Sequence, residues 1–154
     1  MLHSALAPFE KSNDGSSIQK NAFQLQQDLQ ETMQDKVGIV RNERDMQDAL
    51  TRIDKLKKQA GQVAVFGHRE YNPGWHTAID LHSLLTVAEA VTRTALDRRE
   101  SRGAHFRDDF PEKIHEFAKV NIVVKKGDDG QMKVHRQPLV EMTQEQEGII
   151  EEMK

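Results

Sequence analysis

Residues 74–99 have the sequence GWHTAIDLHSLLTVAEAVTRTALDRR, in which apolar residues recur every three or four positions. This spacing places them along one face of an α-helix. The expected buried face comprises Ala78, Leu81, Leu85, Ala88, Val91 and Ala95. A long helix with a single apolar face needs other amphipathic elements to cover that face. The stretch therefore predicts a helical fold built around this segment.

Two shorter amphipathic helices are expected before this segment, and both have clear end signals. Gly38 ends the first, Asn42 is a suitable N-cap for the second, and Gly61 stops it. Their apolar positions are Leu25, Leu29, Met33 and Val37 in the first, and Met46, Ala49, Leu50, Ile53 and Leu56 in the second. Three such helices joined by short loops predict an antiparallel bundle like a spectrin repeat.

We expect the chain to divide into three parts within a mainly α fold. Residues 1–20 mix Ser, Asn, Asp and Gly with few large apolar residues and predict a flexible lead-in. Residues 21–111 form the three-helix bundle. Residues 112–154 form an extended tail with a short β-hairpin, because two β-rich runs flank Gly127–Gly130, and a short acidic helix ends the chain.

The composition limits the function classes. Of the 154 residues, 31% are charged and 36% are apolar, whereas globular domains are usually about 45–50% apolar. We therefore expect part of the chain either to be a tail or to pack on a partner. The net charge of −3 argues against nucleic-acid binding. The absence of cysteine excludes iron–sulfur ligation by this chain and fits a cytoplasmic setting. No apolar run approaches the roughly 20 residues that cross a bilayer, so direct membrane insertion is not expected.

The sequence gives only weak support for a metal site and for a catalytic triad. His76 and Asp80 lie four apart on one helix face, but no third or fourth ligand stands at a recognisable spacing, so a structural or surface role is favoured. Ser101, His105 and Asp109 have the residue types of a nucleophilic triad. Such triads come from distant segments and need a separate oxyanion hole, which three residues within nine positions do not provide.

The charged stretch RRESRGAHFRDDFP, residues 98–111, has two explanations that stay open. Its arginines are interleaved with acids, which nearly cancel the positive charge that a nucleic-acid site needs. One explanation is a solvated helix end, with arginines on exposed carbonyls, a glycine turn at Gly103 and local ion pairs. The other is a docking patch that pairs with acids on another domain.

Tyr71 and Trp75 are the only Tyr and Trp in the chain, and they flank Asn72-Pro73-Gly74. They are expected to form a packing anchor that sets how the long helix enters the bundle. The alternative is an anchor that faces a partner.

The long helix and the charged stretch together resemble a known protein family. Residues 70–113 resemble the C-terminal helical domain of the flavoprotein subunits of succinate dehydrogenase and fumarate reductase, which L-aspartate oxidases and adenylylsulfate reductases share. Its most specific part is the signature Glu100, Ser101, Arg102, Gly103, His105, Arg107, Asp109, Phe110 and Pro111. The runs LQETMQDKVGIVRNERDMQDAL and KVNIVVKK…VHRQPLVEM are also similar to the family, so the resemblance covers about residues 20–154. Ile114 and Phe117 depart from it, because an acid and a tryptophan are common there.

The resemblance implies a helical buttress in an oxidoreductase that interconverts succinate and fumarate. FAD and the catalytic residues lie elsewhere in such subunits, and this chain has no glycine-rich dinucleotide fingerprint. It is therefore expected to be a detached C-terminal piece, to which no catalytic, cofactor-binding or metal residue is assigned. Its implied partners are the flavin and capping domains and an iron–sulfur subunit, through which it would associate with the cytoplasmic face of a membrane.

Eight residues are assigned to an interdomain or subunit interface on this basis. They are Tyr71, Trp75, Glu100, Arg102, His105, Arg107, Asp109 and Arg136. An isolated chain with such a face exposed is expected to self-associate. The rival hypothesis is a stand-alone helical module for protein interaction.

Overall fold

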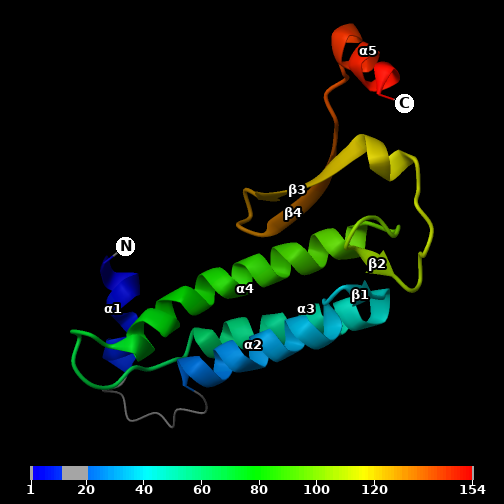
Figure 1. The fold of residues 1–154 in the computed structure, drawn as a ribbon. Coiled ribbons are helices and arrows are strands. Elements are labelled where there is room, and N and C mark those ends of the chain that lie inside the picture. Colours follow the sequence, from blue (N-terminus) through cyan, green and yellow to red (C-terminus); the bar gives the residue numbers. More distant parts are fainter. Residues whose placement is uncertain (1, 12–20, 154) are drawn as a thin grey trace.

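The structure is a computed structural model that describes residues 2–11 and 21–153. Three helices form its centre: α2 (Ala22–Lys36), α3 (Glu43–Ala60) and α4 (Pro73–Asp97). In Figure 1, α2 and α3 lie side by side beneath the longer α4. The mainly helical fold with a three-helix bundle is thus confirmed.

Each helix of the bundle begins at an asparagine. The side-chain oxygens of Asn21, Asn42 and Asn72 accept the backbone N–H three residues later, at 2.9, 2.8 and 3.1 Å. Each cap satisfies an N–H group that has no partner within its helix, and such caps contribute about 1 kcal/mol. The start of each of the three helices is therefore specified by local sequence.

The core lies between α2, α3 and α4, and one predicted position is wrong. Val91 is 40% exposed, whereas its neighbours Glu89 and Thr92 are buried. The Thr92 hydroxyl donates to the Ala88 carbonyl at 2.7 Å, and Glu89 pairs with Lys57 and Arg93. Polar groups with such partners can occupy the buried face, so α4 is rotated slightly from the orientation that apolar spacing alone predicts.

The first residues of the chain differ from the predicted flexible lead-in over residues 1–20. Residues 2–11 form helix α1 (Leu2–Lys11), and Phe9 is buried in the core cluster with its ring centroid 5.7 Å from that of Trp75. Leu6 also packs against the core, one turn before Phe9. These two apolar residues share one helix face, which explains why the segment docks. Residues 12–20 lie outside the described part.

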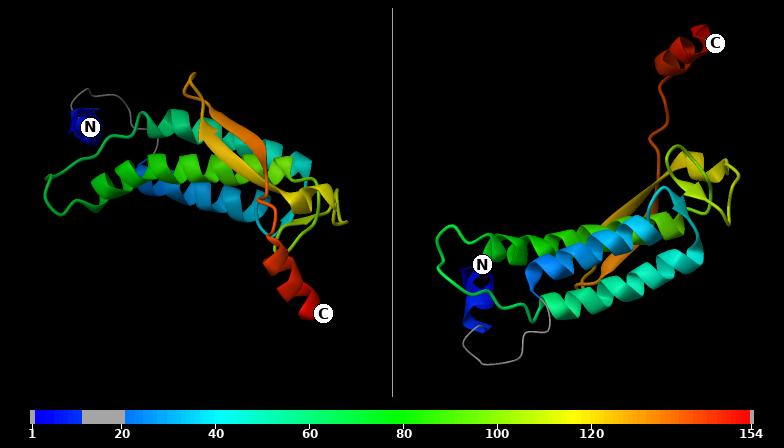
Figure 2. Two further views of the ribbon diagram at one scale, coloured as in Figure 1. Left: turned by 90° about the horizontal axis from the view of Figure 1, so that it is seen from above. Right: turned by 60° about the horizontal axis from the view of Figure 1, so that its bottom comes forward.

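Four short strands complete the architecture of the described residues. β3 (Val120–Lys126) and β4 (Met132–Pro138) form the expected antiparallel hairpin, which crosses the outer side of α4 in Figure 2. β1 (Val40–Arg41) and β2 (Phe106–Arg107) pair in parallel, which the sequence pattern did not predict. A 3₁₀ turn, η1 (Glu116–Lys119), leads into β3.

Helix α5 (Gln144–Glu152) follows residues 139–143 and lies away from the bundle in Figures 1 and 2. Several apolar side chains of this last segment are exposed, including Val140 at 94%, Ile149 at 52% and Ile150 at 44%. Within residues 2–11 and 21–153, no helix is both long and apolar enough to cross a membrane.

Candidate functional site

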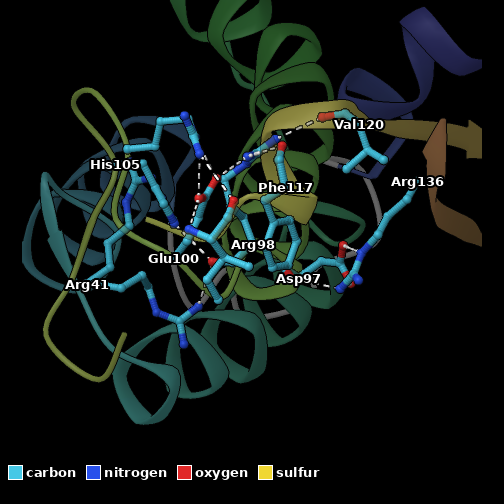
Figure 3. A network of polar contacts seen from close by, with 11 residues as sticks. Arg41, Asp97, Arg98, Glu100, His105, Phe117, Val120 and Arg136 are labelled. Carbon is cyan, nitrogen blue, oxygen red and sulfur yellow. Dashed lines mark hydrogen bonds and ion pairs between the residues drawn. The ribbon is translucent and has the colours of Figure 1, made fainter. Parts of the chain in front are cut away.

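One end of the bundle concentrates charged side chains, where α4 ends, α3 begins and β1 pairs with β2. We call this cluster the arginine corner. It consists of Arg41, Arg98, Glu100, Arg102, His105, Arg107 and Asp109 (Figure 3 labels four of them).

Arg107 is fully buried and closes the end of α4. Its Nη1 group donates to the carbonyl oxygens of Ala95, Leu96 and Arg98 at 3.1–3.3 Å. Its Nε and Nη2 groups donate to the two carboxylate oxygens of Asp109, both at 2.7 Å. The guanidinium group of Arg107 lowers the pKa of Asp109 to about 2. Arg107 therefore satisfies carbonyls that a helix end leaves without partners, and Asp109 neutralises its charge.

Glu100 is the second fully buried charge of the corner. Its carboxylate accepts bonds from Arg98 at 2.6 Å, from Arg102 at 2.8 and 3.0 Å, and from the Ile114 backbone N–H at 2.8 Å. Hydrogen bonding from Arg102 outweighs burial and lowers the pKa of Glu100 to about 2. Arg98 also donates to the Phe117 carbonyl at 3.2 Å, so Glu100 and Arg98 hold the loop before β3 against the bundle.

His105 connects this cluster to β1. Arg41 Nη1 lies 2.8 Å from His105 Nδ1, and His105 Nε2 lies 3.1 Å from the Arg98 carbonyl. An arginine can only donate, so Nδ1 accepts and the ring proton sits on Nε2. Burial lowers the pKa of His105, and the charges of Arg41, Arg107 and Arg98 add to this effect. His105 is thus held neutral in one tautomer.

The structure does not form the triad that Ser101, His105 and Asp109 suggested. The Ser101 hydroxyl accepts the Arg107 N–H at 2.8 Å and donates to the Phe110 carbonyl at 3.0 Å. His105 and Asp109 are engaged with arginines as described above. All three residues therefore fix the loop, and none is aligned to activate another.

The predicted glycine turn is present at Gly103, whose φ is +60°. Arg102 and His105 exchange two backbone hydrogen bonds, at 2.8 and 3.1 Å, on either side of this turn. The predicted helix end with arginines on carbonyls and local ion pairs is confirmed. It is not solvated at its centre, however, because Glu100 and Arg107 have no exposed surface.

Arg136 holds the hairpin to the bundle from the opposite side of the corner, as Figure 3 shows. Its guanidinium group donates to both carboxylate oxygens of Asp97, at 2.9 and 3.1 Å, across 39 residues of sequence. It also lies 4.6 Å from the ring centroid of Phe117. The residue stays partly exposed, with 48% of its side chain accessible.

The two predicted aromatic anchors behave differently. Trp75 packs against the core, and its Nε1–H donates to the Ala5 carbonyl at 2.7 Å. Tyr71 is 98% exposed and has a positive φ of 52°, so it is not a packing anchor within this chain. Its position directly before the Asn72 cap explains the strained backbone, because the chain turns sharply into α4 there.

His76 and Asp80 receive no further ligand from the part of the chain that the structure describes. Among the described residues, no group of three or more His, Asp or Glu side chains is placed to hold a metal ion. His76 instead lies beside Trp75, with their ring centroids 5.4 Å apart.

Arg41 is the functional candidate that the sequence did not reveal. It stands 64 residues from His105, and no local pattern relates the two. With Arg41 included, the corner carries more positive than negative charge, because its four guanidinium groups face only two carboxylates. The arrangement can therefore stabilise one end of the bundle and attract an acidic group.

Known proteins are similar to this chain in sequence and in fold. The family model described as "Fumarate reductase flavoprotein C-term" matches residues 26–148. An uncharacterized FAD-dependent oxidoreductase of Methanocaldococcus jannaschii is 39% identical over 105 residues, and the fumarate reductase flavoprotein subunit of Mycobacterium tuberculosis is 30% identical over 116. These matches cover 68% and 75% of this chain but only 19% and 20% of the two relatives.

A solved structure is similar to the chain in both sequence and fold. A chain in the structure of Mycobacterium smegmatis Sdh1 in complex with UQ1 is 38% identical, with a TM-score of 0.84. The match covers 97% of this chain and 25% of that one. The chain thus spans about a fifth of the length of the curated relatives it matches and a quarter of the solved chain.

Proposed function

The chain belongs to the family of fumarate reductase flavoprotein C-terminal domains, and from this we propose that it is the helical C-terminal domain of a succinate dehydrogenase or fumarate reductase flavoprotein subunit. Its role there is to support the flavin-containing domain and the contacts to partner subunits. The enzyme would interconvert succinate and fumarate, and this chain would supply no catalytic group. The agreement in fold and sequence over 97% of the chain carries this proposal.

The arginine corner supports a scaffold role. Its two fully buried charged groups, Arg107 and Glu100, hold a helix end and a loop through their hydrogen bonds. A rigid corner of this kind keeps neighbouring surfaces in fixed positions, which a docking domain requires. Five of the eight interface residues proposed from the sequence then fall into two groups. Tyr71, Arg102 and Arg136 reach the surface, whereas Glu100 and Arg107 would act by holding their neighbours in place.

We further propose that the partners are the flavin and capping domains and an iron–sulfur subunit, with FAD bound outside this chain. Membrane association on the cytoplasmic face would then occur only through partner subunits. Exposed apolar side chains that a partner would cover include Val87, Val140 and Ile149. The same surfaces lead us to expect self-association of the isolated chain, which light scattering at rising concentration would detect.

A chimera tests the function. The matching segment of the M. smegmatis Sdh1 chain, 38% identical, would be replaced by this chain. The purified protein would then be assayed for bound flavin and for succinate-dependent dye reduction. We expect both to exceed clearly those of a version that lacks the segment. A matched chimera that carries Arg107→Ala should lose much of the gain. A chimera no better than the deletion would refute the scaffold role.

A further inference from the structure

A cleft of about 430 Å³ opens beside the arginine corner, between α4 and β3. Its polar lining comes from Arg41, Arg98, His105, Thr94 and Asn121, and its apolar wall from Val91, Ala95 and Ile122. Figure 3 shows Arg41 and His105 together on one side of the corner, away from the Arg136–Asp97 pair.

Arg41 has hydrogen-bond donors to spare in this cleft. Its Nε–H is directed at the carbonyl oxygens of Val37 and Gly38, at 3.2 and 2.5 Å, and one Nη1–H donates to His105. A guanidinium group has five N–H donors in a planar fork. The second Nη1–H and both Nη2–H groups have no acceptor among the described residues. This edge of the fork matches the two oxygens of a carboxylate.

Arg41 also has no counter-ion among the described residues. Arg98 and Arg102 share Glu100, and Arg107 has Asp109, whereas the acceptors of Arg41 are all uncharged. Burial lowers the pKa of Arg41, which shows that its charge has lost part of its hydration. A partly desolvated cation without an anionic partner is unfavourable, so an incoming anion would gain from pairing with it.

His105 keeps the guanidinium group in this orientation. Its unprotonated Nδ1 accepts one Nη1–H, while its Nε2–H is anchored on the Arg98 carbonyl. His105 is therefore a positioning residue for Arg41, and its protonation would both remove the acceptor and add a like charge.

We propose that this cleft binds the carboxylate of an aspartate or glutamate side chain of a partner polypeptide, with Arg41 as the charged ligand. The surplus positive charge and the free edge of the fork select a carboxylate. The exposed Val91 and the neighbouring Ile122 offer apolar surface for the stem of the acidic residue. The contacts and charges that form this site belong to the chain itself, so the site does not depend on the flavoprotein assignment.

A polypeptide fits better than a free anion or a nucleic acid. A small free anion would leave the apolar wall of the cleft in water, whereas a side chain covers it. A nucleic acid would bring a row of phosphates to a chain with a net charge of −3. A single carboxylate on an otherwise neutral segment matches one unpaired guanidinium group.

The test uses the full chain labelled with ¹⁵N and the peptide N-acetyl-Ala-Glu-Ala-amide. Side-chain N–H signals of arginine are followed by NMR during titration, with the Gln peptide, acetate and inorganic phosphate as separate arms. We expect the Arg41 signal to shift saturably with the Glu peptide, at least roughly tenfold tighter than with the Gln peptide. Binding of acetate or phosphate as tight as that of the Glu peptide would overturn the proposal.

Two variants, each with a matched control variant, make the result specific. Arg41→Gln should abolish the preference for Glu, whereas Arg44→Gln, which removes the same charge from an exposed position on α3, should leave it intact. Val91→Glu supplies a carboxylate inside the cleft and should block the peptide without removing Arg41. Val87→Glu, one turn away and outside the cleft lining, is its control. If Val91→Glu and Val87→Glu bind the peptide equally, the proposed site is wrong.

Discussion

Arg107 and Asp109 are two residues apart, and their side chains meet in a two-point ion pair with both N–O distances at 2.7 Å. The pair joins two helix ends. Arg107 donates to carbonyls at the end of α4, and Asp109 accepts the Glu43 N–H at the start of α3, at 2.9 Å. Each charge therefore lies where the helix dipole favours it.

Removing the arginine of this pair should destabilise the chain strongly. Arg107→Ala would leave the α4 carbonyls without their buried donor and Asp109 without its partner, so we expect a loss of about 2–4 kcal/mol in unfolding free energy. Urea denaturation followed by circular dichroism measures this. Arg44→Ala at an exposed site should cost less than about 0.5 kcal/mol. Similar losses in the two variants would contradict the assignment.

Acid should weaken the corner through Glu100. Its pKa is lowered from 4.5 to about 2 in the folded chain, so the unfolded state binds a proton first as the pH falls. The stabilisation is complete above about pH 4.5 and is lost as the pH falls toward 2. At about 1.4 kcal/mol per pKa unit, it amounts to roughly 3 kcal/mol.

The measurement for Glu100 is the pH dependence of unfolding rather than stability at one pH. Glu100→Gln should be less stable at pH 7 and should show a shallower decline between pH 4.5 and 2 than the wild type. Parallel curves for the two proteins would show that Glu100 does not carry the effect.

His105 should titrate below its ordinary pKa of 6.5, because burial and three nearby arginines oppose its protonation. Its contribution to stability is then complete above pH 6.5 and is lost as the pH falls through its folded pKa. The C2–H signal of His105 in proton NMR reports the midpoint directly. Arg41→Gln should raise that midpoint, whereas Arg44→Gln should not. An unchanged midpoint in Arg41→Gln would show that the contact with Arg41 is absent in solution.

Replacing the buried Glu89 together with its partner Lys57 should destabilise the chain by less than the sum of the two single replacements. It is 7% exposed and pairs with Lys57 and Arg93. Lys57→Met removes one of its partners, and Glu89→Leu leaves Lys57 without its carboxylate, so each should cost about 1–3 kcal/mol. The double variant packs two apolar side chains together and should cost less than the sum. Additive losses in a denaturation cycle would contradict this coupling.

The helices of the bundle could be predicted because their signals are local. Asn42 and Gly61 mark the ends of α3 within the sequence itself, and Leu81 and Leu85 recur at helical spacing. The hairpin turn at Gly130, with a φ of 75°, is equally local. Such features depend on a few neighbouring residues, so a pattern in the sequence is sufficient to find them.

The arginine corner could be predicted only in part, for a physical reason. Glu100, Arg107 and Asp109 are close in sequence, so their pairing was open to inference. The contact between Arg41 and His105 depends on how α2 and α4 pack, and no spacing rule connects residues 64 apart. The burial of Thr92 in place of Val91 was missed because hydrophobic periodicity counts only apolar residues. It does not register that the Thr92 hydroxyl is satisfied by the Ala88 carbonyl and can therefore be buried.

The parallel pairing of β1 with β2 has a consequence for the order of folding. It closes a loop of more than sixty residues for only two residue pairs, whereas α3 and α4 meet through a short connection. Loop closure of that length is unfavourable until the helices have already brought the ends together. The strand pair should therefore form after the rate-limiting step, and substitutions there should speed unfolding while leaving the folding rate nearly unchanged.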